Sequence, residues 1–362
     1  MKLARRIIAV VVLLAAVAGG LFFAFREPRH LLSLDRPQGL GKRLLFTFTG
    51  FAGGTRPLEW GLRVNEVNFS PDGKRLATST WRFTTLPAEL QVRDAFTGTE
   101  LLSIKQTSLD GDRVAFSAEG KHLIALGHEE GRGQSMTVWD AAIGRKMRTI
   151  GETTRDGKAV VGANGKRLAT WRNGVSKIWD IPSGQPLVEL SATNLVIVAF
   201  SPDGKLAAVT VVQANPKASL KDAKLFDAKT GEEVLTLKGG VYTDLRQVEF
   251  SSDGKRIASL SYPNRVKLWN VATGEPVPLK LNGDTGQGIC MAISPDGNRI
   301  ALESGSDIKV WDVASGEPQL TLKGYKRGVG CMRFSPCGNR LATAALAGTA
   351  LDLWDVSLDR RN

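Results

Sequence analysis

Short runs of alternating apolar and polar residues recur along most of the chain, separated by turns that contain glycine. The stretch Met291–Tyr325 contains such runs at Met291–Ile293, Arg299–Glu303, Ile308–Trp311 and Leu320–Leu322. Alternation with a period of two is typical of β-strands, so this stretch predicts a four-stranded antiparallel sheet. One sheet of this size buries too little surface to be stable alone. The pattern therefore predicts that the sheet packs against copies of itself.

Copies of this pattern fill the rest of the chain. A Trp-Asp pair or a variant of it ends the third strand of each copy: Arg93-Asp94, Trp139-Asp140, Trp179-Asp180, Phe226-Asp227, Trp269-Asn270, Trp311-Asp312 and Trp354-Asp355. These seven pairs recur about every forty-four residues. The turn between the first and second strands ends in glycine in every copy and reads Ser-Pro-Asp-Gly at Ser70–Gly73, Ser201–Gly204 and Ser294–Gly297. Proline presets φ for such a turn, and glycine accepts the positive φ that closes it.

The phrases VNFSPDGKRLATST, AFSPDGKLAAV, EFSSDGKRIASL…VKLWNVATGE and FSPCGNRLATA…LDLWDVS carry a family resemblance. Over residues 43–357 the chain resembles WD40 repeats of the bacterial type. The resemblance implies an all-β fold, a seven-bladed β-propeller of four-stranded antiparallel blades. WD40 repeats often place a Gly-His pair before the first strand, and its His ties the Trp to a loop Asp. Here the corresponding pairs are Gly151-Glu152, Gly239-Gly240, Gly283-Asp284 and Gly324-Tyr325. We therefore expect this buried polar tie to be missing in every blade.

The two ends of the repeat region complement one another. The last copy stops after its third strand, at Leu353–Val356, with no fourth strand before Asn362. The segment Phe46–Phe51 matches the fourth-strand segment Leu320–Tyr325 position by position. We therefore predict that the N-terminal strand completes the last blade, which removes open sheet edges and closes the ring. Residues 358–362 form a short C-terminal tail.

An apolar segment precedes the repeats. Ile7–Phe25 is a run of 19 uncharged residues after a basic start, and as a helix it would span roughly 28 Å, close to the thickness of a bilayer core. We interpret residues 1–26 as a signal anchor with one transmembrane helix and residues 27–42 as a tether. The alternative is a signal peptide cleaved after Ala18, at the A-x-A site Ala16–Ala18, which would release a secreted protein. Basic residues before the apolar run favour a cytoplasmic N-terminus and an extracytoplasmic, periplasmic propeller.

The charge of the chain is positive but dispersed. The formal net charge is +12, and much of the excess is the Lys or Arg that follows the turn glycines, as in Lys74-Arg75, Lys166-Arg167 and Lys255-Arg256. Dispersed charge of this kind is typical of a solvated rim. Nucleic-acid binding requires clustered charge with interleaved aromatics, so we expect no nucleic-acid partner.

No motif in the sequence indicates catalysis or a cofactor. The three histidines are His30 in the tether, His122 at a strand start and His128 in a loop, and they match no metal or triad spacing. Cys290, Cys331 and Cys337 also lack metal-ligand spacing, and we interpret them as small buried or turn residues. We therefore expect a protein that is not an enzyme, with no cofactor, no metal and no small-molecule substrate.

The two ends of the predicted propeller differ, and this difference indicates where a partner binds. The glycine turns share one end, which we call the turn end. The other end, which we call the irregular end, carries long excursions at Thr80–Glu89, Gly127–Ser135 and Val211–Asp222. Loops on a rigid scaffold commonly carry binding residues, and aromatic and Arg side chains dominate interface energies. The candidate partner-binding residues are Trp81, Arg82, Tyr242, Tyr325, Lys326 and Arg327.

The function that this arrangement favours is a non-catalytic, membrane-tethered protein-interaction platform whose protein partner the sequence does not identify. The alternative is an enzyme or a small-ligand-binding propeller that uses the central channel. That alternative requires a convergent polar cluster at the channel mouth.

Overall fold

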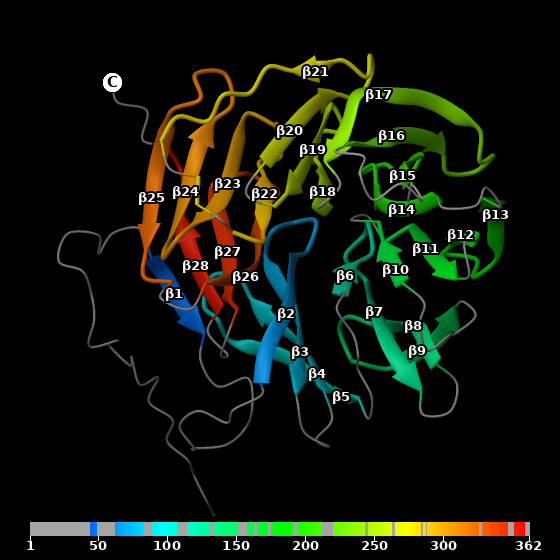
Figure 1. The fold of residues 1–362 in the computed structure, drawn as a ribbon. Coiled ribbons are helices and arrows are strands. Elements are labelled where there is room, and N and C mark those ends of the chain that lie inside the picture. Colours follow the sequence, from blue (N-terminus) through cyan, green and yellow to red (C-terminus); the bar gives the residue numbers. More distant parts are fainter. Residues whose placement is uncertain are drawn as a thin grey trace, which may run out of the picture. The chain divides into compact units, whose positions relative to one another are not determined.

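The structure is a computed structural model. All the residues that it describes belong to one unit, Leu40–Asn362 (Figure 1). They are residues 44–48, 62–82, 88–106, 114–129, 133–150, 158–162, 165–172, 175–190, 195–211, 220–242, 245–262, 265–283, 285–286, 288–325, 328–346 and 351–358.

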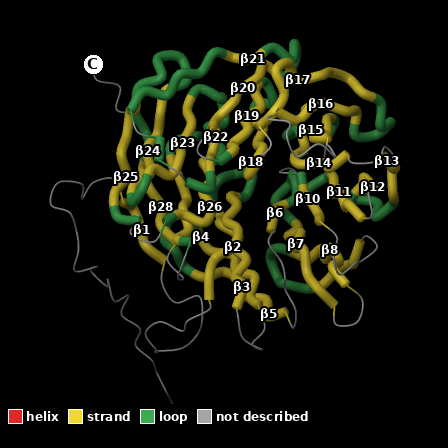
Figure 2. Tube along the Cα trace, viewed as in Figure 1, coloured by secondary structure: helices red, strands yellow, loops and turns green. Residues whose placement is uncertain are grey.

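The described residues form seven four-stranded antiparallel sheets arranged as the blades of a propeller (Figures 1 and 2). The first, innermost strands are β2 (Leu62–Phe69), β6 (Val114–Phe116), β10 (Lys158–Val161), β14 (Leu195–Phe200), β18 (Leu245–Phe250), β22 (Met291–Ile293) and β26 (Val329–Phe334). The second strands are β3 (Arg75–Arg82), β7 (His122–Glu129), β11 (Arg167–Arg172), β15 (Leu206–Val211), β19 (Arg256–Ser261), β23 (Arg299–Ser304) and β27 (Arg340–Ala345).

The outer half of each blade follows the same order. The third strands are β4 (Ala88–Asp94), β8 (Gly133–Asp140), β12 (Val175–Asp180), β16 (Leu220–Asp227), β20 (Arg265–Asn270), β24 (Asp307–Asp312) and β28 (Leu351–Asp355). The fourth strands of blades 1 to 6 are β5 (Glu100–Gln106), β9 (Lys146–Ile150), β13 (Pro186–Leu190), β17 (Glu233–Tyr242), β21 (Pro276–Val277) and β25 (Pro318–Lys323). In the seventh sheet β1 (Leu44–Phe48) pairs antiparallel with β28.

Side-chain hydrogen bonds explain why the same turn residues recur. In the turn after β2, the Ser70 hydroxyl donates to Asp72 at 2.5 Å, and Asp72 in turn accepts the backbone N–H of Lys74 at 3.0 Å. Gly73 closes the turn with a φ of +69°, a conformation that side chains other than glycine rarely adopt. The Asp of each Trp-Asp pair caps the next turn, as Asp94 does by accepting the N–H groups of Phe96 and Thr97 at 2.8 and 2.7 Å. These bonds hold the turn end in one repeated geometry.

The hydrophobic core is divided into seven clusters, and each cluster joins two neighbouring blades. Phe116 of blade 2, for example, packs with Leu90 of blade 1. The cluster between blades 7 and 1 contains Val67 and Leu76 from one side and Leu353 from the other. The blades are therefore held together mainly by apolar burial between adjacent sheet faces.

Several arginines after the turn glycines act between blades, which corrects the interpretation of these residues as a solvated rim. Arg75 donates to the Gly120 carbonyl of blade 2 at 2.6 Å, and Arg256 donates to Gly297 of blade 6 at 2.8 Å. Arg299 donates to the carbonyl groups of Gly338 and Val356 in blade 7 at 2.6 and 2.7 Å. Arg340 of blade 7 donates to the Ala95 carbonyl of blade 1 at 3.1 Å. The lysines Lys74, Lys205 and Lys255 remain exposed. Lysine and arginine at adjacent positions thus have different roles.

Blade 7 contains the buried polar tie that the sequence led us to expect in no blade. The Trp354 indole N–H donates to the Tyr325 hydroxyl at 2.8 Å and to Thr343 Oγ1 at 3.0 Å. The Tyr325 hydroxyl donates to Asp352 at 2.8 Å and also contacts the Thr343 hydroxyl. The expectation was wrong for this blade because a tyrosine hydroxyl can join an indole and a carboxylate as an imidazole does.

Three other tryptophans satisfy their indole nitrogens with different acceptors. Trp269 and Trp311 donate to the backbone carbonyls of Lys238 and Asn282 at 2.9 and 3.1 Å. Trp179 donates to Thr170 Oγ1 at 3.0 Å. The Trp139 indole nitrogen is buried without a hydrogen-bond partner in the described part of the chain.

Strands extend further into the irregular end than the sequence predicts. β7 and β8 pair as far as Glu129 and Gly133, so His128 lies in a strand and not in a loop. β16 begins at Leu220, inside the predicted excursion Val211–Asp222, and Tyr242 ends β17. Among the described residues no helix is long and apolar enough to cross a membrane. The predicted span Ile7–Phe25 lies outside these residues.

We expect the substitution Tyr325→Phe to destabilise the propeller by about 1–3 kcal/mol, because it leaves the buried Trp354 N–H and Thr343 hydroxyl without their shared partner. Urea denaturation of the purified full-length chain measures this change. The control is Tyr262→Phe, the same change on an exposed ring, which we expect to alter stability by less than about 0.5 kcal/mol. Equal effects of the two substitutions would contradict a stabilising role for the tie.

Candidate functional site

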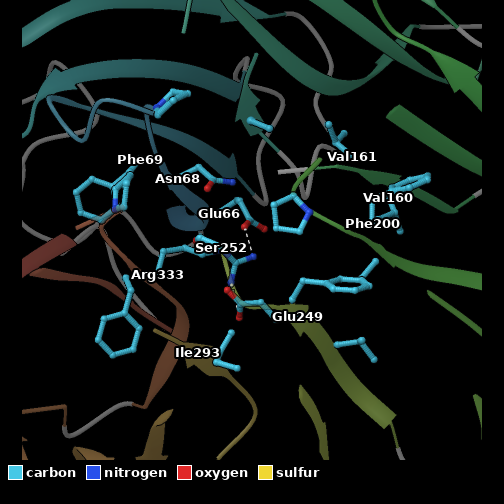
Figure 3. Close-up of a pocket in the computed structure, with 18 of the residues that line it drawn as sticks. Glu66, Asn68, Phe69, Val160, Val161, Phe200, Glu249, Ser252, Ile293 and Arg333 are labelled. Atoms are coloured by element: carbon cyan, nitrogen blue, oxygen red, sulfur yellow. Dashed lines mark hydrogen bonds and ion pairs between the residues drawn. The ribbon is translucent and has the colours of Figure 1, made fainter. Parts of the chain in front are cut away.

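A cavity of about 430 Å³ lies at the centre of the ring, on the side of the turn end (Figure 3). Residues from all seven first strands line it, because each first strand is the free inner edge of its sheet. Pro71, Pro202 and Pro336, the second residues of three first turns, also line it. Most of the lining residues are apolar, among them Val160 and Phe200, but polar and apolar atoms contribute about equally to the exposed wall. The size is within the range of small-molecule sites.

Three charged side chains converge in this cavity. Arg333 of β26 lies between Glu66 of β2 and Glu249 of β18 (Figure 3). Its Nη2 is 2.8 Å from Glu66 Oε1, and its Nη1 is 3.7 Å from Glu249 Oε2. The side chains are 22%, 11% and 19% exposed for Arg333, Glu66 and Glu249. The cluster therefore brings blades 7, 1 and 5 together inside a largely desolvated space.

The two glutamates are not equivalent. Arg333 pairs directly with Glu66, whereas Glu249 lies farther from the guanidinium and receives hydrogen bonds from Gln247 Nε2 at 3.1 Å and from the Ile293 backbone N–H. Burial raises the pKa of Glu249 to about 7; Arg333 opposes this rise and Glu66 adds to it. Burial acts to lower the pKa of Arg333, but the two carboxylates outweigh burial and raise it above its ordinary value, so Arg333 stays charged.

Sequence reasoning missed this cluster, although a signal for it exists. Arg333 and Glu249 both stand two residues before the serine of the first turn, and Asn68 stands at the same position in blade 1. Blades 2, 4 and 6 carry Ala115, Ala199 and Ala292 there. Comparing the seven repeats at this one position would have identified the polar exceptions.

Two amide side chains cap the free inner edges of the first strands. Asn68 Nδ2 donates to the Val114 carbonyl of blade 2 at 3.0 Å. Gln247 Nε2 donates to the Met291 carbonyl at 2.8 Å, and Gln247 Oε1 accepts the Met291 N–H at 3.0 Å. These bonds satisfy backbone groups that a sheet edge otherwise leaves unpaired. Both amides therefore join adjacent blades at the cavity wall.

Other buried polar groups near the ring centre have structural roles. Glu303 is 8% exposed, and its carboxylate accepts the N–H groups of Ile289 and Val329 at 3.2 and 3.1 Å. Cys290 and Cys331 are buried, which raises the pKa of both thiols, in Cys331 to about 12. Both stay protonated at neutral pH and are weak nucleophiles. Cys337 is exposed in a turn.

The predicted partner-binding residues are only partly described. Trp81 and Arg82 end β3, and Tyr242 ends β17. The side chains of these three residues, together with Lys326 and Arg327, lie outside the described part.

Tyr325 does not match its predicted role as an exposed anchor. It is 5% exposed, and its hydroxyl is bound within the blade-7 tie. Burial of the ring is the physical reason for this correction, because a partner cannot contact a side chain that neighbouring blades already cover.

The remaining sequence candidates bring no metal or triad chemistry together. His122 begins β7 and is partly exposed, while His30 and the side chain of His128 lie outside the described residues. In the part of the chain that the structure describes, no three His, Cys, Asp or Glu side chains are grouped so that they could hold a metal ion.

The sequence is similar to one known family in two segments. Residues 231–270 and 316–355 match the family described as "WD domain, G-beta repeat". No curated protein matches the chain. The first segment covers β17 to β20 and the second covers β25 to β28. Each match therefore begins with the fourth strand of one blade and continues through three strands of the next blade.

We expect the Glu249 carboxyl to make the stability of the propeller depend on pH. Because its pKa is higher in the folded protein than the value of about 4.3 in an unfolded chain, its contribution to stability falls as pH rises from about 4.3 to about 7. Glu249→Gln removes this effect, so the variant should be more stable than the parent by about 1–3 kcal/mol at pH 8. Urea denaturation of both proteins between pH 5 and pH 8 tests this. A difference that does not grow with pH would contradict the raised pKa.

Proposed function

We propose that this protein is a non-catalytic protein-interaction platform that binds a protein partner through the irregular end of the propeller. The fold is a seven-bladed propeller with similarity to WD40 repeats, and WD40 propellers are typically protein-interaction scaffolds. The observation that carries the proposal is the difference between the two ends. Asp-capped turns with nearly the same geometry repeat around the turn end. A surface of equivalent turns offers little to distinguish one partner from another.

The irregular end supplies the chemical variety that specific binding requires. Trp81 and Arg82 at the end of β3, Tyr242 at the end of β17 and the pair Lys326-Arg327 come from different blades. An aromatic side chain can fill a pocket on a partner, while basic side chains attract an acidic surface. Tyr325 has no part in this proposal, because it belongs to the core of blade 7.

We also propose that residues 1–26 anchor the protein in a membrane, with the N-terminus cytoplasmic and the propeller on the extracytoplasmic side. The support is the length of the apolar run Ile7–Phe25 and the basic residues before it. Cleavage after Ala18 is the alternative, and it would place the same propeller in solution outside the cytoplasm.

The pairing of β1 with β28 supports the proposal that the N-terminal strand closes the ring. The match of the family to 316–355 ends with the third strand of blade 7. Phe46–Phe51 carries the sequence of a fourth strand, and closure by it would leave no unpaired third strand.

We expect alanine at both Trp81 and Tyr242, or glutamate at both Arg82 and Arg327, to weaken partner capture at least about fivefold. Crosslinking in intact cells, followed by purification of the full-length chain, identifies the partner and measures its capture. The matched control is charge reversal of the exposed lysines Lys74, Lys205 and Lys255 at the turn end. Loss of capture in this control, with normal capture by the irregular-end variants, would refute the choice of surface.

An uncleaved anchor should keep the full-length chain in the membrane pellet after carbonate washing, with Met1 present in the protein. Washing at high pH removes peripheral proteins but not a chain held by an apolar transmembrane helix. Recovery of a soluble chain that begins at Gly19 would establish cleavage instead.

Deletion of Lys42–Gly50 should strongly destabilise the propeller or cause aggregation, because it exposes the edge of β28. Thermal unfolding of the deleted and intact chains compares their stabilities. Cooperative unfolding of the deleted chain near the temperature of the intact protein would show that this strand does not close the ring.

A further inference from the structure

The central cavity carries an excess of negative charge. Among the described residues that line it, Glu66, Glu249 and Arg333 are the charged ones, so the ionised cluster has a net charge of −1. Arg333 is engaged by Glu66, by the Met332 carbonyl at 3.1 Å and, at longer range, by Glu249. Glu249 is therefore the carboxylate whose charge Arg333 compensates less, although the neutral donors Gln247 and the Ile293 N–H also bind it. Its charge faces a cavity that is also lined by apolar residues, among them Val160 and Phe200 (Figure 3).

We propose that this cavity binds a small organic ammonium ion, with the ammonium group against Glu249 and an apolar body against Val160, Val198 and Phe200. This function is independent of partner binding at the irregular end. It assigns a ligand to the central channel on the basis of the convergent polar cluster. A cation supplies the missing positive charge, and the valine and phenylalanine side chains can cover a hydrocarbon group.

The geometry disfavours an anionic ligand and a metal ion. An anion would have to compete with Glu66 and Glu249 for Arg333 and would enter a cavity that is already negative. A metal ion would find two carboxylates with a guanidinium between them, and this positive charge repels a cation placed at their midpoint. An ammonium ion would instead approach Glu249 Oε1, because Oε2 is the oxygen that contacts Arg333 and accepts the hydrogen bond from Gln247.

The cost of burying the Glu249 charge also favours a cationic ligand. A partly buried carboxylate without full compensation opposes folding when it ionises, whereas the alanines at the equivalent positions of three other blades carry no such cost. A charged residue at a position where other blades carry alanine is expected where the side chain serves binding. A bound ammonium ion would offset the cost by completing the charge balance in the folded state.

Binding should depend on pH through the charge of Glu249. The groups that face this carboxyl are Arg333, Glu66 and the amide of Gln247, and the nearby thiols Cys290 and Cys331 stay neutral. Because the pKa of Glu249 is about 7, the carboxyl is mostly ionised at pH 8 and mostly protonated at pH 6. Affinity for an ammonium ion should therefore be about tenfold higher at pH 8 than at pH 6. At pH 7 binding should release a fraction of a proton.

Isothermal titration of the purified full-length chain tests the proposal with phenethylammonium as the probe. Two analogues of similar size serve as chemical controls: 2-phenylethanol, which is neutral, and 3-phenylpropanoate, which is an anion. We expect the ammonium ion to bind at least about tenfold more tightly than either analogue at pH 8. Titrations in buffers of different ionisation enthalpy measure the proton release at pH 7.

Three variants connect binding to the cavity. Glu249→Gln should weaken phenethylammonium binding at least about tenfold and remove its pH dependence. Val160→Phe should weaken binding because the larger side chain occupies the space proposed for the apolar body of the ligand. Glu119→Gln removes an exposed carboxylate at the same end, outside the cavity lining, and should leave binding unchanged. Denaturation curves confirm that each variant is folded.

Several results would overturn the proposal. Tighter binding of 3-phenylpropanoate than of phenethylammonium would show that Arg333 selects an anion. Equal binding by the parent and by Glu249→Gln, or no binding of the ammonium ion at millimolar concentration to the folded parent, would show that the cluster is structural. Binding of the peptide acetyl-Ala-Lys-Ala-amide in the absence of phenethylammonium binding would replace the small-molecule site with a pocket for a partner's lysine.

Discussion

Burial of each blade between its two neighbours is the constraint on which the rest of this structure depends. A four-stranded sheet of this length has apolar residues on both faces and cannot be stable alone. The core accordingly consists of clusters that each belong to two blades, such as the one that joins Phe116 to Leu90. The same constraint gives the arginines after the turns their role, because Arg75 and Arg340 bind carbonyl groups across the interfaces that the apolar residues create.

The ring that results has a consequence for its centre. Stacking covers both faces of every sheet, but it leaves the inner edge of each first strand facing the central cavity. Side chains that point from this inner edge into the cavity do not have to pack between two blades. Some of them, such as Asn68 and Gln247, satisfy the free backbone edges. Arg333, Glu66 and Glu249 instead form a charged cluster, which is the chemical feature that distinguishes this centre from a ring of alanines.

The indole groups show how far repeats with a common pattern can differ in detail. A Trp at the end of a third strand always enters an interface, yet its N–H finds a backbone carbonyl in Trp269 and a hydroxyl in Trp179. In blade 7 it finds both a tyrosine and a threonine. A polar group in a desolvated interface needs a partner, but any correctly placed acceptor satisfies it. In blade 7 a phenol therefore serves to join the indole to a carboxylate.

The sequence by itself determined the fold, because alternation, turn chemistry and repeat length are local patterns that a chain carries along its length. Strand alternation and the glycine turns after Ser70 and Ser294 predicted repeated four-stranded sheets, and the resemblance to WD40 repeats implied a seven-bladed propeller. Strand ends at the irregular end were predicted less well, because pairing as far as Glu129 depends on the partner strand and not on the local pattern. Only the tertiary structure decided which residues meet across the ring. Glu66 and Arg333 are 267 positions apart, and nothing in either local pattern encodes their contact. The tertiary structure also determined burial. Tyr325, predicted on the binding surface, is buried in the core, and burial raises the pKa of Glu249. The candidate site was thus hidden from the sequence because its parts acquire their chemistry only when seven blades close around them.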